Sequence, residues 1–503
     1  MSAANLSLLR FIVTGLVLWS CTIGTSLARQ VPITLFHTTG LSGQLDLSEE
    51  ERVGGLLRCA TIIGQARETE RNVVLVDTGD FLSGAAESDV LDGRPMVEAM
   101  RWLKYDAMVP GDRDFEAGAW ELNDFPWTAA NLDGLTGCVS NRVISVDGVR
   151  VAFIGLADPL LDQKIPPGLR EGLSMRASAE VLRENILRLR EQAVEVVVLL
   201  VHQEFGSHFP DGVSSIRDMM FQFPGLDVVI GASDGGRKVA SRVDGGVLYT
   251  QAAANGRALG RVDLVWDTVK QALIARDARV ITLNNRVWLH GPLVQHLQPL
   301  RKQAETLLAE PLAELPTALT LKASADRPAA VVDLVGSAAV SALEQPSIVL
   351  MEQSYLPARI PVGVATRRGV WNWFPQDYRW ATCSVTGAEL RGIVAEALAW
   401  SDKPVPEILA HGLTFEVDRA EPVGQQVFQL RDLNGKSINA RKRLSIAFPS
   451  AWLSEWHRPG FSASRRIFAR PIAQLEIHET TMRVAVIDHL QQLDSIGVGG
   501  HER

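Results

Sequence analysis

The sequence predicts a layered α/β domain, then a connecting helix, then a smaller α+β domain. The chain has 503 residues, which is too long for one ordinary domain. From about residue 31 to 283, short apolar runs alternate with amphipathic stretches, whereas mixed short strands and helices follow residue 320. We therefore place the domains at residues 29–287 and 319–495, with the connecting helix and linker at 288–318.

The first 28 residues have the features of an export signal. Arg10 precedes the apolar run from Phe11 to Trp19, and the small-residue site Ser26-Leu27-Ala28 follows. This run is too short to span a bilayer. We expect cleavage near Ala28, with lipid attachment at Cys21 as the weaker alternative. The mature protein is then expected in the periplasm or secreted, without a membrane span.

The α/β domain is predicted from its strand candidates, which are ITLFH, NVVLVD, VAFIGL, EVVVLLVH, DVVIG and VLYTQ. Most are continuous apolar runs, as in strands that are covered on both faces. Amphipathic stretches at 47–67 and 178–193 are the helix candidates, and Ser178 is a candidate N-cap. In such domains the loops that leave the carboxyl ends of strands usually build the functional site.

Residues 290–312 have the spacing of the connecting helix. Pro292 opens it, and Pro299 is expected to kink it. The second domain should end with a helix over residues 480–494 that stops at Gly497.

Composition argues against some functions. The net charge is −8 and no long basic run is present, so nucleic acid is not an expected partner. Cys59, Cys138 and Cys383 remain after cleavage; they are far apart and odd in number. They predict neither a disulfide framework nor a zinc site.

Polar residues follow several of the predicted strands. Asp80 comes after Gly79 at a strand end, a common place for a metal-binding carboxylate, with an Asx-turn as the alternative. The segment GDRD (111–114) puts two carboxylates around Arg113, and a salt-bridged turn would explain it too. His202 ends an apolar strand, as core histidines also do. Together these loops indicate a hard-metal or phosphate site.

The order and the amino-acid sequences of these loops resemble those of the 5′-nucleotidase family of calcineurin-like metallophosphoesterases. The matching segments are HTTGLSGQ, VDTGD, YDAMVPGDRDFEAG, AANL, GASDG and QAAANGRALGRVDL. The resemblance runs from about residue 31 to 490. It implies a metallophosphoesterase-like domain with a 5′-nucleotidase C-terminal domain.

The resemblance implies a pair of divalent ions, and this chain departs from that pattern for the first ion. Family ligands are replaced at Gly40, Ser42 and Gly235, which leaves only the shared Asp80. One carboxylate cannot hold an ion in a defined geometry.

The second ion retains more of its implied ligands. The family positions are Asp80, Asp112, His202 and Ser233, and Asp234 could replace the last of them. We therefore expect at most one divalent ion. Oxygen and nitrogen ligands of this kind suit Mn²⁺, Mg²⁺ or Zn²⁺.

Arg113 and the adjacent Asp114 are the candidate catalytic residues. Arg113 occupies the position of the family's catalytic histidine. Arginine stabilises charge but does not release a proton at neutral pH, so general acid catalysis is lost. A solvated surface arginine is the alternative.

The resemblance also implies two aromatic residues that stack on a nucleotide base. Trp380 and Phe461 occupy these positions, although ordinary core aromatics would fit the same pattern. The family's glycine-rich phosphate and ribose loop has become MEQSYLPAR, which argues against nucleotide binding.

Three functions remain open at this point. We favour an exported, impaired or non-catalytic member of the family that binds a nucleotide or another phosphoester. The second is an active phosphohydrolase that uses one metal ion at Asp80, Asp112 and His202. The third is a structural or interaction protein without a small ligand.

Overall fold

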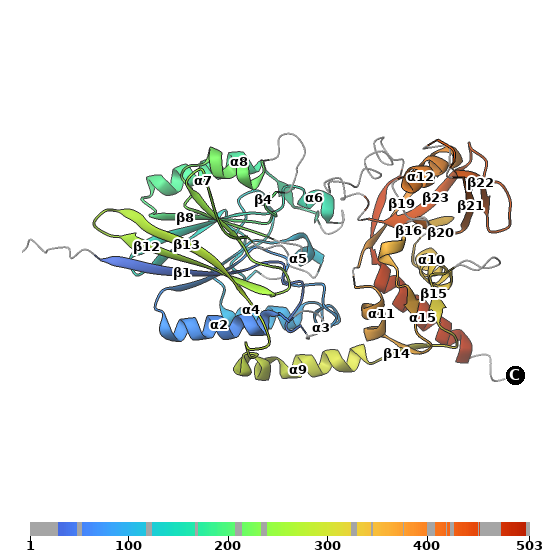
Figure 1. Ribbon diagram of the computed structural model, residues 1–503, viewed down its shortest axis with the longest axis horizontal. Coiled ribbons are helices and arrows are strands. Elements are labelled where there is room, and N and C mark those ends of the chain that lie inside the picture. Colours follow the sequence, from blue (N-terminus) through green and yellow to red (C-terminus); the bar gives the residue numbers. More distant parts are fainter. Residues whose placement is uncertain are drawn as a thin grey trace, which may run out of the picture.

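The fold is described from a computed structural model of the chain. It describes residues 29–47, 53–116, 123–165, 170–206, 214–232, 239–322, 329–343, 346–375, 377–399, 408–418, 420–422, 427–450, 452 and 474–498. Figure 1 shows an N-terminal and a C-terminal domain, with helix α9 (Gly291–Leu308) running between them. The predicted export signal lies outside the described residues.

Two β-sheets form the centre of the described N-terminal domain. One has the strand order β13 (Ala272–Thr282), β12 (Ala258–Asp267), β1 (Gln30–Thr38), β2 (Val73–Asp77) and β3 (Ala107–Met108). The other has the order β10 (Val239–Asp244), β11 (Val247–Gln251), β9 (Val228–Gly231), β8 (Val196–Val201), β6 (Val149–Leu156) and β5 (Asn141–Val146). Every predicted strand segment corresponds to one of these strands.

The sheets pack face to face because alternate side chains of each strand point to a shared core. Ile33 and Leu35 of β1 belong to the same buried cluster as Val198 and Leu200 of β8. Phe36, the next residue after Leu35, points the other way and packs with the helices on the outer face. The continuous apolar runs in the sequence follow from this double covering.

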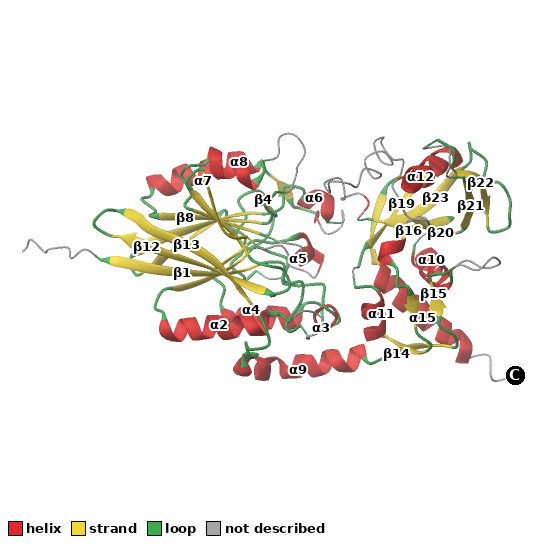
Figure 2. Ribbon diagram, in the orientation of Figure 1, coloured by secondary structure: helices red, strands yellow, loops and turns green. Residues whose placement is uncertain are grey.

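Helices cover the outer face of each sheet. Helices α2 (Leu56–Thr69) and α4 (Arg94–Leu103) pack on the β1–β2 side, and α7 (Ser178–Glu191) and α8 (Ile216–Gln222) pack on the β6–β8 side. Figure 2 shows these helices outside the strands. The predicted layered α/β architecture is confirmed, with two sheets between the helical layers.

Some predicted helix ends were wrong. Helix α2 begins at Leu56 because Gly55 before it has a φ of 93°, which is not helical. The N-cap of α7 is Ala177, so Ser178 is the first helical residue. Helix α15 (Met482–Val498) extends one residue beyond Gly497, the predicted stop.

The connecting helix is present as α9. The Nδ1 atom of His290 accepts a hydrogen bond of 3.2 Å from the Leu293 N–H, which caps the first turn. The helix continues through Pro299. It is followed by β14 (Pro311–Leu315), which pairs with β18 (Gly363–Thr366), so residues predicted as linker belong to the C-terminal β-structure.

The C-terminal domain has the expected α+β character. Its main sheet has the order β20 (Ile408–His411), β16 (Ile348–Glu352), β23 (Arg443–Pro449), β19 (Arg379–Thr386) and β24 (Glu476–Thr481). Its helices include α10 (Ala330–Ala342), α11 (Arg367–Trp373), α12 (Gly387–Ala399) and α15. Shorter described strands are β15 (Leu319–Thr320), β17 (Arg359–Ile360), β21 (Leu413–Val417) and β22 (Val427–Asp432) here, and the paired β4 (Leu132–Asp133) and β7 (Ser174–Met175) in the N-terminal domain.

Polar contacts join the domains at α3 (Ala86–Asp89). Asp89 Oδ2 accepts a hydrogen bond of 3.3 Å from Trp371 Nε1 and lies 3.6 Å from Arg483 Nη1. Its Oδ1 accepts from the Gly84 N–H at 2.7 Å. Asp89 therefore connects the C-terminal domain to the segment that follows Asp80.

Among the described residues, no helix is both long enough and apolar enough to cross a membrane.

Candidate metal centre

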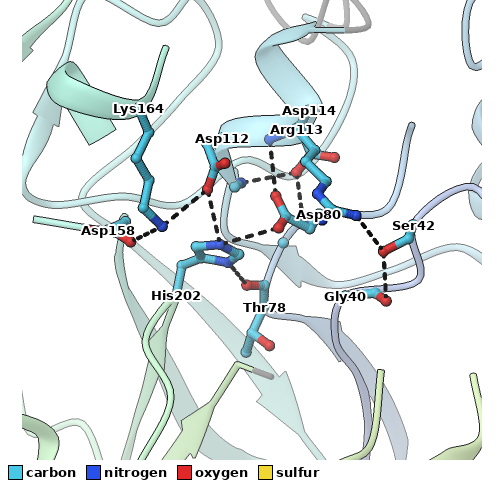
Figure 3. A network of polar contacts seen from close by, with 12 residues as sticks. Gly40, Ser42, Thr78, Asp80, Asp112, Arg113, Asp114, Asp158, Lys164 and His202 are labelled. Atoms are coloured by element: carbon cyan, nitrogen blue, oxygen red, sulfur yellow. Dashed lines mark hydrogen bonds and ion pairs between the residues drawn. The ribbon is translucent and has the colours of Figure 1, made fainter. Parts of the chain in front are cut away.

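The structure brings Asp80, Asp112 and His202 together at the carboxyl ends of strands. Asp80 follows β2, Asp112 begins α5 (Asp112–Glu116) shortly after β3, and His202 follows β8 of the facing sheet. One ligand atom from each side chain lies within 4.8 Å of the others. Figure 3 shows the three side chains pointing toward one another.

The separations between these atoms are suitable for a cation. His202 Nε2 lies 3.6 Å from Asp80 Oδ2 and 3.8 Å from Asp112 Oδ1, which is too far for good hydrogen bonds. Ligands at about 2.1 Å from a tetrahedral ion lie about 3.4 Å from one another. The donor set therefore fits one divalent ion, which would act as a Lewis acid toward a phosphoryl oxygen.

A backbone contact orients the His202 ring. Its Nδ1 lies 2.6 Å from the Thr78 carbonyl oxygen, which can only accept a hydrogen bond. Nδ1 therefore carries the proton, and in the neutral ring Nε2 presents its lone pair to the carboxylates. The ring is buried, so this orientation is held by packing as well.

The tight approach of the loops requires glycine. A Cβ at Gly79 would lie 2.6 Å from His202 Nδ1, and a Cβ at Gly111 would lie 2.1 Å from Asp80 Oδ1. Asp80 itself has a φ of 62°, in the left-handed region. Its Oδ1 accepts a hydrogen bond of 3.0 Å from the Arg113 N–H, which orients the carboxylate.

Asp114 is fully buried and organises the loops that carry the site. Its carboxylate accepts hydrogen bonds from the backbone N–H groups of Gly111, Asp80, Phe81 and Leu82. Burial raises the pKa of this carboxyl, and the N–H groups act in the opposite direction. These bonds hold the two loops together, and the catalytic role predicted for Asp114 stays a prediction.

The side chain of Arg113 is exposed and reaches across the opening loop. Its Nη1 donates a hydrogen bond of 3.2 Å to Ser42 Oγ. The loop itself is tied to the Asp80 segment, because Gly40 N donates to Gly79 O and Ser42 N donates to Asp80 O. Figure 3 places Arg113 and Ser42 beside Asp80, on the side opposite Lys164.

Sequence reasoning missed Lys164 and Asp158. Lys164, the last residue of α6 (Leu161–Lys164), has its Nζ 3.4 Å from Asp112 Oδ1 and 2.7 Å from Asp158 Oδ2. Burial raises the pKa of Asp112, but attraction to Lys164 and a contact with His202 outweigh it and hold the pKa well below its usual range. Asp158 follows the carboxyl end of β6, and this position after a strand is the sequence signal that could have identified it.

The other predicted site residues are not brought to this centre. Asp234 and Phe461 lie outside the described residues. Trp380 lies in β19, is 1% exposed and packs in the C-terminal core. In this conformation a base could stack on Trp380 only if neighbouring side chains moved, so its role in nucleotide binding stays a prediction.

The fold of two facing sheets joined by a helix to an α+β domain is similar to that of several solved structures. A 5′-nucleotidase-like protein from Staphylococcus aureus, solved with alpha-ketoglutarate, aligns with a TM-score of 0.71 at 18% identity, over 92% of this chain and 97% of that one. The 5′-nucleotidase precursor from Thermus thermophilus aligns with a TM-score of 0.61 at 18% identity, with the same coverage.

Sequence comparison agrees with the fold. The snake venom 5′-nucleotidase of Crotalus adamanteus is 25% identical over 310 residues, which cover 54% of this chain and 51% of that protein. The chain spans about half the length of the curated relatives it matches, and no protein-family model matches it. The chain is therefore similar in sequence to curated 5′-nucleotidases and in fold to solved ones.

Proposed function

We propose that this chain binds one divalent ion through Asp80, Asp112 and His202 and a nucleotide or another phosphoester beside it, with slow or absent hydrolysis. The convergence of these ligand atoms within 4.8 Å is the observation that carries the proposal. Within the described part of the chain, no other group of three or more acidic, histidine or cysteine side chains meets the same criterion.

The residues around Asp80 support the proposal that hydrolysis is slow or absent. Ser42 lies at a position where the family resemblance implies a metal ligand, and its hydroxyl accepts a hydrogen bond from Arg113. The guanidinium could bind phosphoryl oxygens in a bidentate manner, but it does not protonate a leaving group at neutral pH. Binding is therefore supported more strongly than turnover.

An active phosphohydrolase that uses a single ion is the second candidate. The orientation of His202 favours it, because the bond from Nδ1 to Thr78 leaves Nε2 available as a ligand. In such an enzyme the ion would have to provide most of the charge stabilisation, with Arg113 as the candidate to assist it.

Metal analysis and hydrolysis assays separate these candidates. The purified protein is dialysed against Mn²⁺ or Zn²⁺, the bound ions are counted, and release of phosphate from AMP and from p-nitrophenyl phosphate is measured. The proposal expects about one ion per chain, loss of that ion in Asp80→Ala and His202→Ala, and little phosphate release. Turnover that is lost in Asp80→Ala would favour the single-ion enzyme instead.

A charge-matched control distinguishes loss of a ligand from loss of charge. Asp124→Asn removes a carboxylate whose side chain is 60% exposed and pairs with Arg101. This variant should bind the ion as the wild type does. Two ions bound at full occupancy together with rapid phosphate release would refute the proposal.

We also infer that the protein is exported, from the sequence pattern at residues 1–28. Mass spectrometry of the mature protein tests this inference. A new N-terminus after Ala28 is expected, and a lipid-modified Cys21 would show the alternative anchor. An intact Met1 in protein recovered from its native cell would contradict export.

A further inference from the structure

Lys164 contacts the candidate metal site although an ammonium group cannot be a metal ligand. Its Nζ lies 3.4 Å from Asp112 Oδ1, and this is the oxygen that lies 3.8 Å from His202 Nε2. The side chain of Lys164 is only 26% exposed, so solvent screens its charge less than it screens the charge of a surface lysine. One oxygen of Asp112 thus faces both the candidate ligand His202 and a cation that belongs to the protein.

Asp158 is fixed beside Lys164 on the other side. Its Oδ1 accepts a hydrogen bond of 2.8 Å from the Leu160 N–H, and its Oδ2 lies 2.7 Å from Lys164 Nζ. Asp158 is 6% exposed. The ammonium group is therefore shared between two carboxylates and lies closer to Asp158 than to Asp112.

Any ion bound by Asp112 would share the electron density of that carboxylate with Lys164. A hydrogen-bonding or ionic partner of a ligand changes how strongly the ligand donates to a metal, and mutation of partners that support a ligand typically costs about 10- to 100-fold in affinity. A partner that is a cation also repels the divalent ion directly. Both effects of Lys164 act against metal binding, and Asp158 limits them by holding the ammonium group.

We propose that Lys164 is a positioning residue that competes with the metal ion for Asp112, and that Asp158 sets the strength of this competition. The inference rests on the proposed function, since it assumes that Asp80, Asp112 and His202 hold an ion. It predicts opposite effects for the two partners. Loss of Lys164 should tighten metal binding, and loss of the Asp158 charge should weaken it by releasing Lys164 to Asp112.

Titration of the metal-free protein with Mn²⁺ tests this proposal, with free Mn²⁺ measured by electron paramagnetic resonance at one pH and ionic strength. Lys164→Met should lower the Kd about tenfold, and Asp158→Asn should raise it about tenfold. Lys164→Arg, which keeps the charge, should stay near the wild type. Lys302→Met removes an exposed lysine on α9 and should have no effect.

A double-mutant cycle separates competition through Lys164 from a direct effect of Asp158. If Asp158 acts through the lysine, Asp158→Asn should have little effect in the Lys164→Met background. An equal loss of affinity in both backgrounds would overturn the proposal. Circular dichroism checks folding, and Lys164→Gln replaces Lys164→Met in the cycle if the methionine variant does not fold.

The outcomes distinguish this inference from the proposed function. If neither the wild type nor any variant binds Mn²⁺, the metal site itself is wrong, and the role of Lys164 is refuted with it. If the wild type binds and Lys164→Met has the same Kd, the metal site stands and only the competition is refuted.

Discussion

Asp114→Asn should disrupt the candidate metal centre by breaking the hydrogen bonds that hold its loops, without removing a ligand. Oδ1 of Asp114 accepts from the N–H groups of Phe81 and Leu82 at 2.9 and 3.1 Å. Oδ2 accepts from Asp80 and Gly111, both at 2.9 Å. Asparagine keeps one carbonyl oxygen, so whichever way it is oriented, its amide NH₂ faces a pair of backbone donors.

The size of this effect follows from the number of bonds lost. A buried donor left without an acceptor costs about 1–3 kcal/mol, so two such donors should reduce the free energy of unfolding of the N-terminal domain by about 2–6 kcal/mol. This is a large part of the roughly 5–15 kcal/mol that stabilises a typical domain. Affinity for Mn²⁺ should fall as well, because the Asp80 loop is held by the same bonds.

Hydrogen exchange measured by mass spectrometry over a series of urea concentrations gives the free energy for this domain alone. The peptide that contains Phe81 and Leu82 should lose protection in Asp114→Asn. The control is Asp124→Asn, whose side chain is 60% exposed and should cost less than about 1 kcal/mol. Unchanged protection of that peptide in Asp114→Asn, with wild-type stability, would refute the role assigned to Asp114.

Two further predictions concern acidic residues near this loop, the half-buried Asp89 and the buried Asp77. Asp89→Ala removes one partner of Arg483, which is 3% exposed and also donates from Nε to Phe374 O at 2.7 Å. The change should cost up to about 3 kcal/mol in a urea unfolding experiment, and a cost below about 1 kcal/mol would show that this interdomain contact is weak. Burial raises the pKa of Asp77 from 3.8 to about 8, so the folded state retains a proton that the unfolded state loses. Stability should therefore fall by up to about 1.4 kcal/mol per pH unit between about pH 4 and 8, and Asp77→Asn should remove that slope; equal slopes in the two proteins would contradict the raised pKa.

The strands could be predicted because each is covered on both faces. Val196–Val201 is apolar throughout, since alternate residues contact the facing sheet and the outer helices. The presence of a second sheet was not predicted, because an apolar run does not reveal which element covers each face. Segment ends were least reliable where a single residue decides them, as Gly55 does for α2.

The convergence of the candidate ligands could be predicted because the strands of both facing sheets that carry them end on the same side of the domain. This rule grouped Asp80, the segment GDRD and His202, although they come from distant parts of the sequence, and the family resemblance then singled out Asp112. The rule could not find Lys164, which lies in a four-residue helix and reaches Asp112 across 52 positions of sequence. Nor could it separate a ligand from a loop organiser, since that depends on which way each side chain of GDRD points.

The charge of Lys164 bears on how many divalent ions the site near Asp112 can bind. Among the described residues of this cluster, Asp80, Asp112, Asp114 and Asp158 provide four carboxylates, and Lys164 and Arg113 provide two cations. One divalent ion would neutralise the remaining two negative charges, whereas a second would leave two uncompensated positive charges. Unit charges about 4 Å apart interact by roughly 4 kcal/mol at an effective dielectric constant of about 20, so such an excess would be costly. The lysine therefore favours a single ion on electrostatic grounds, independently of the ligands that the opening loop lacks.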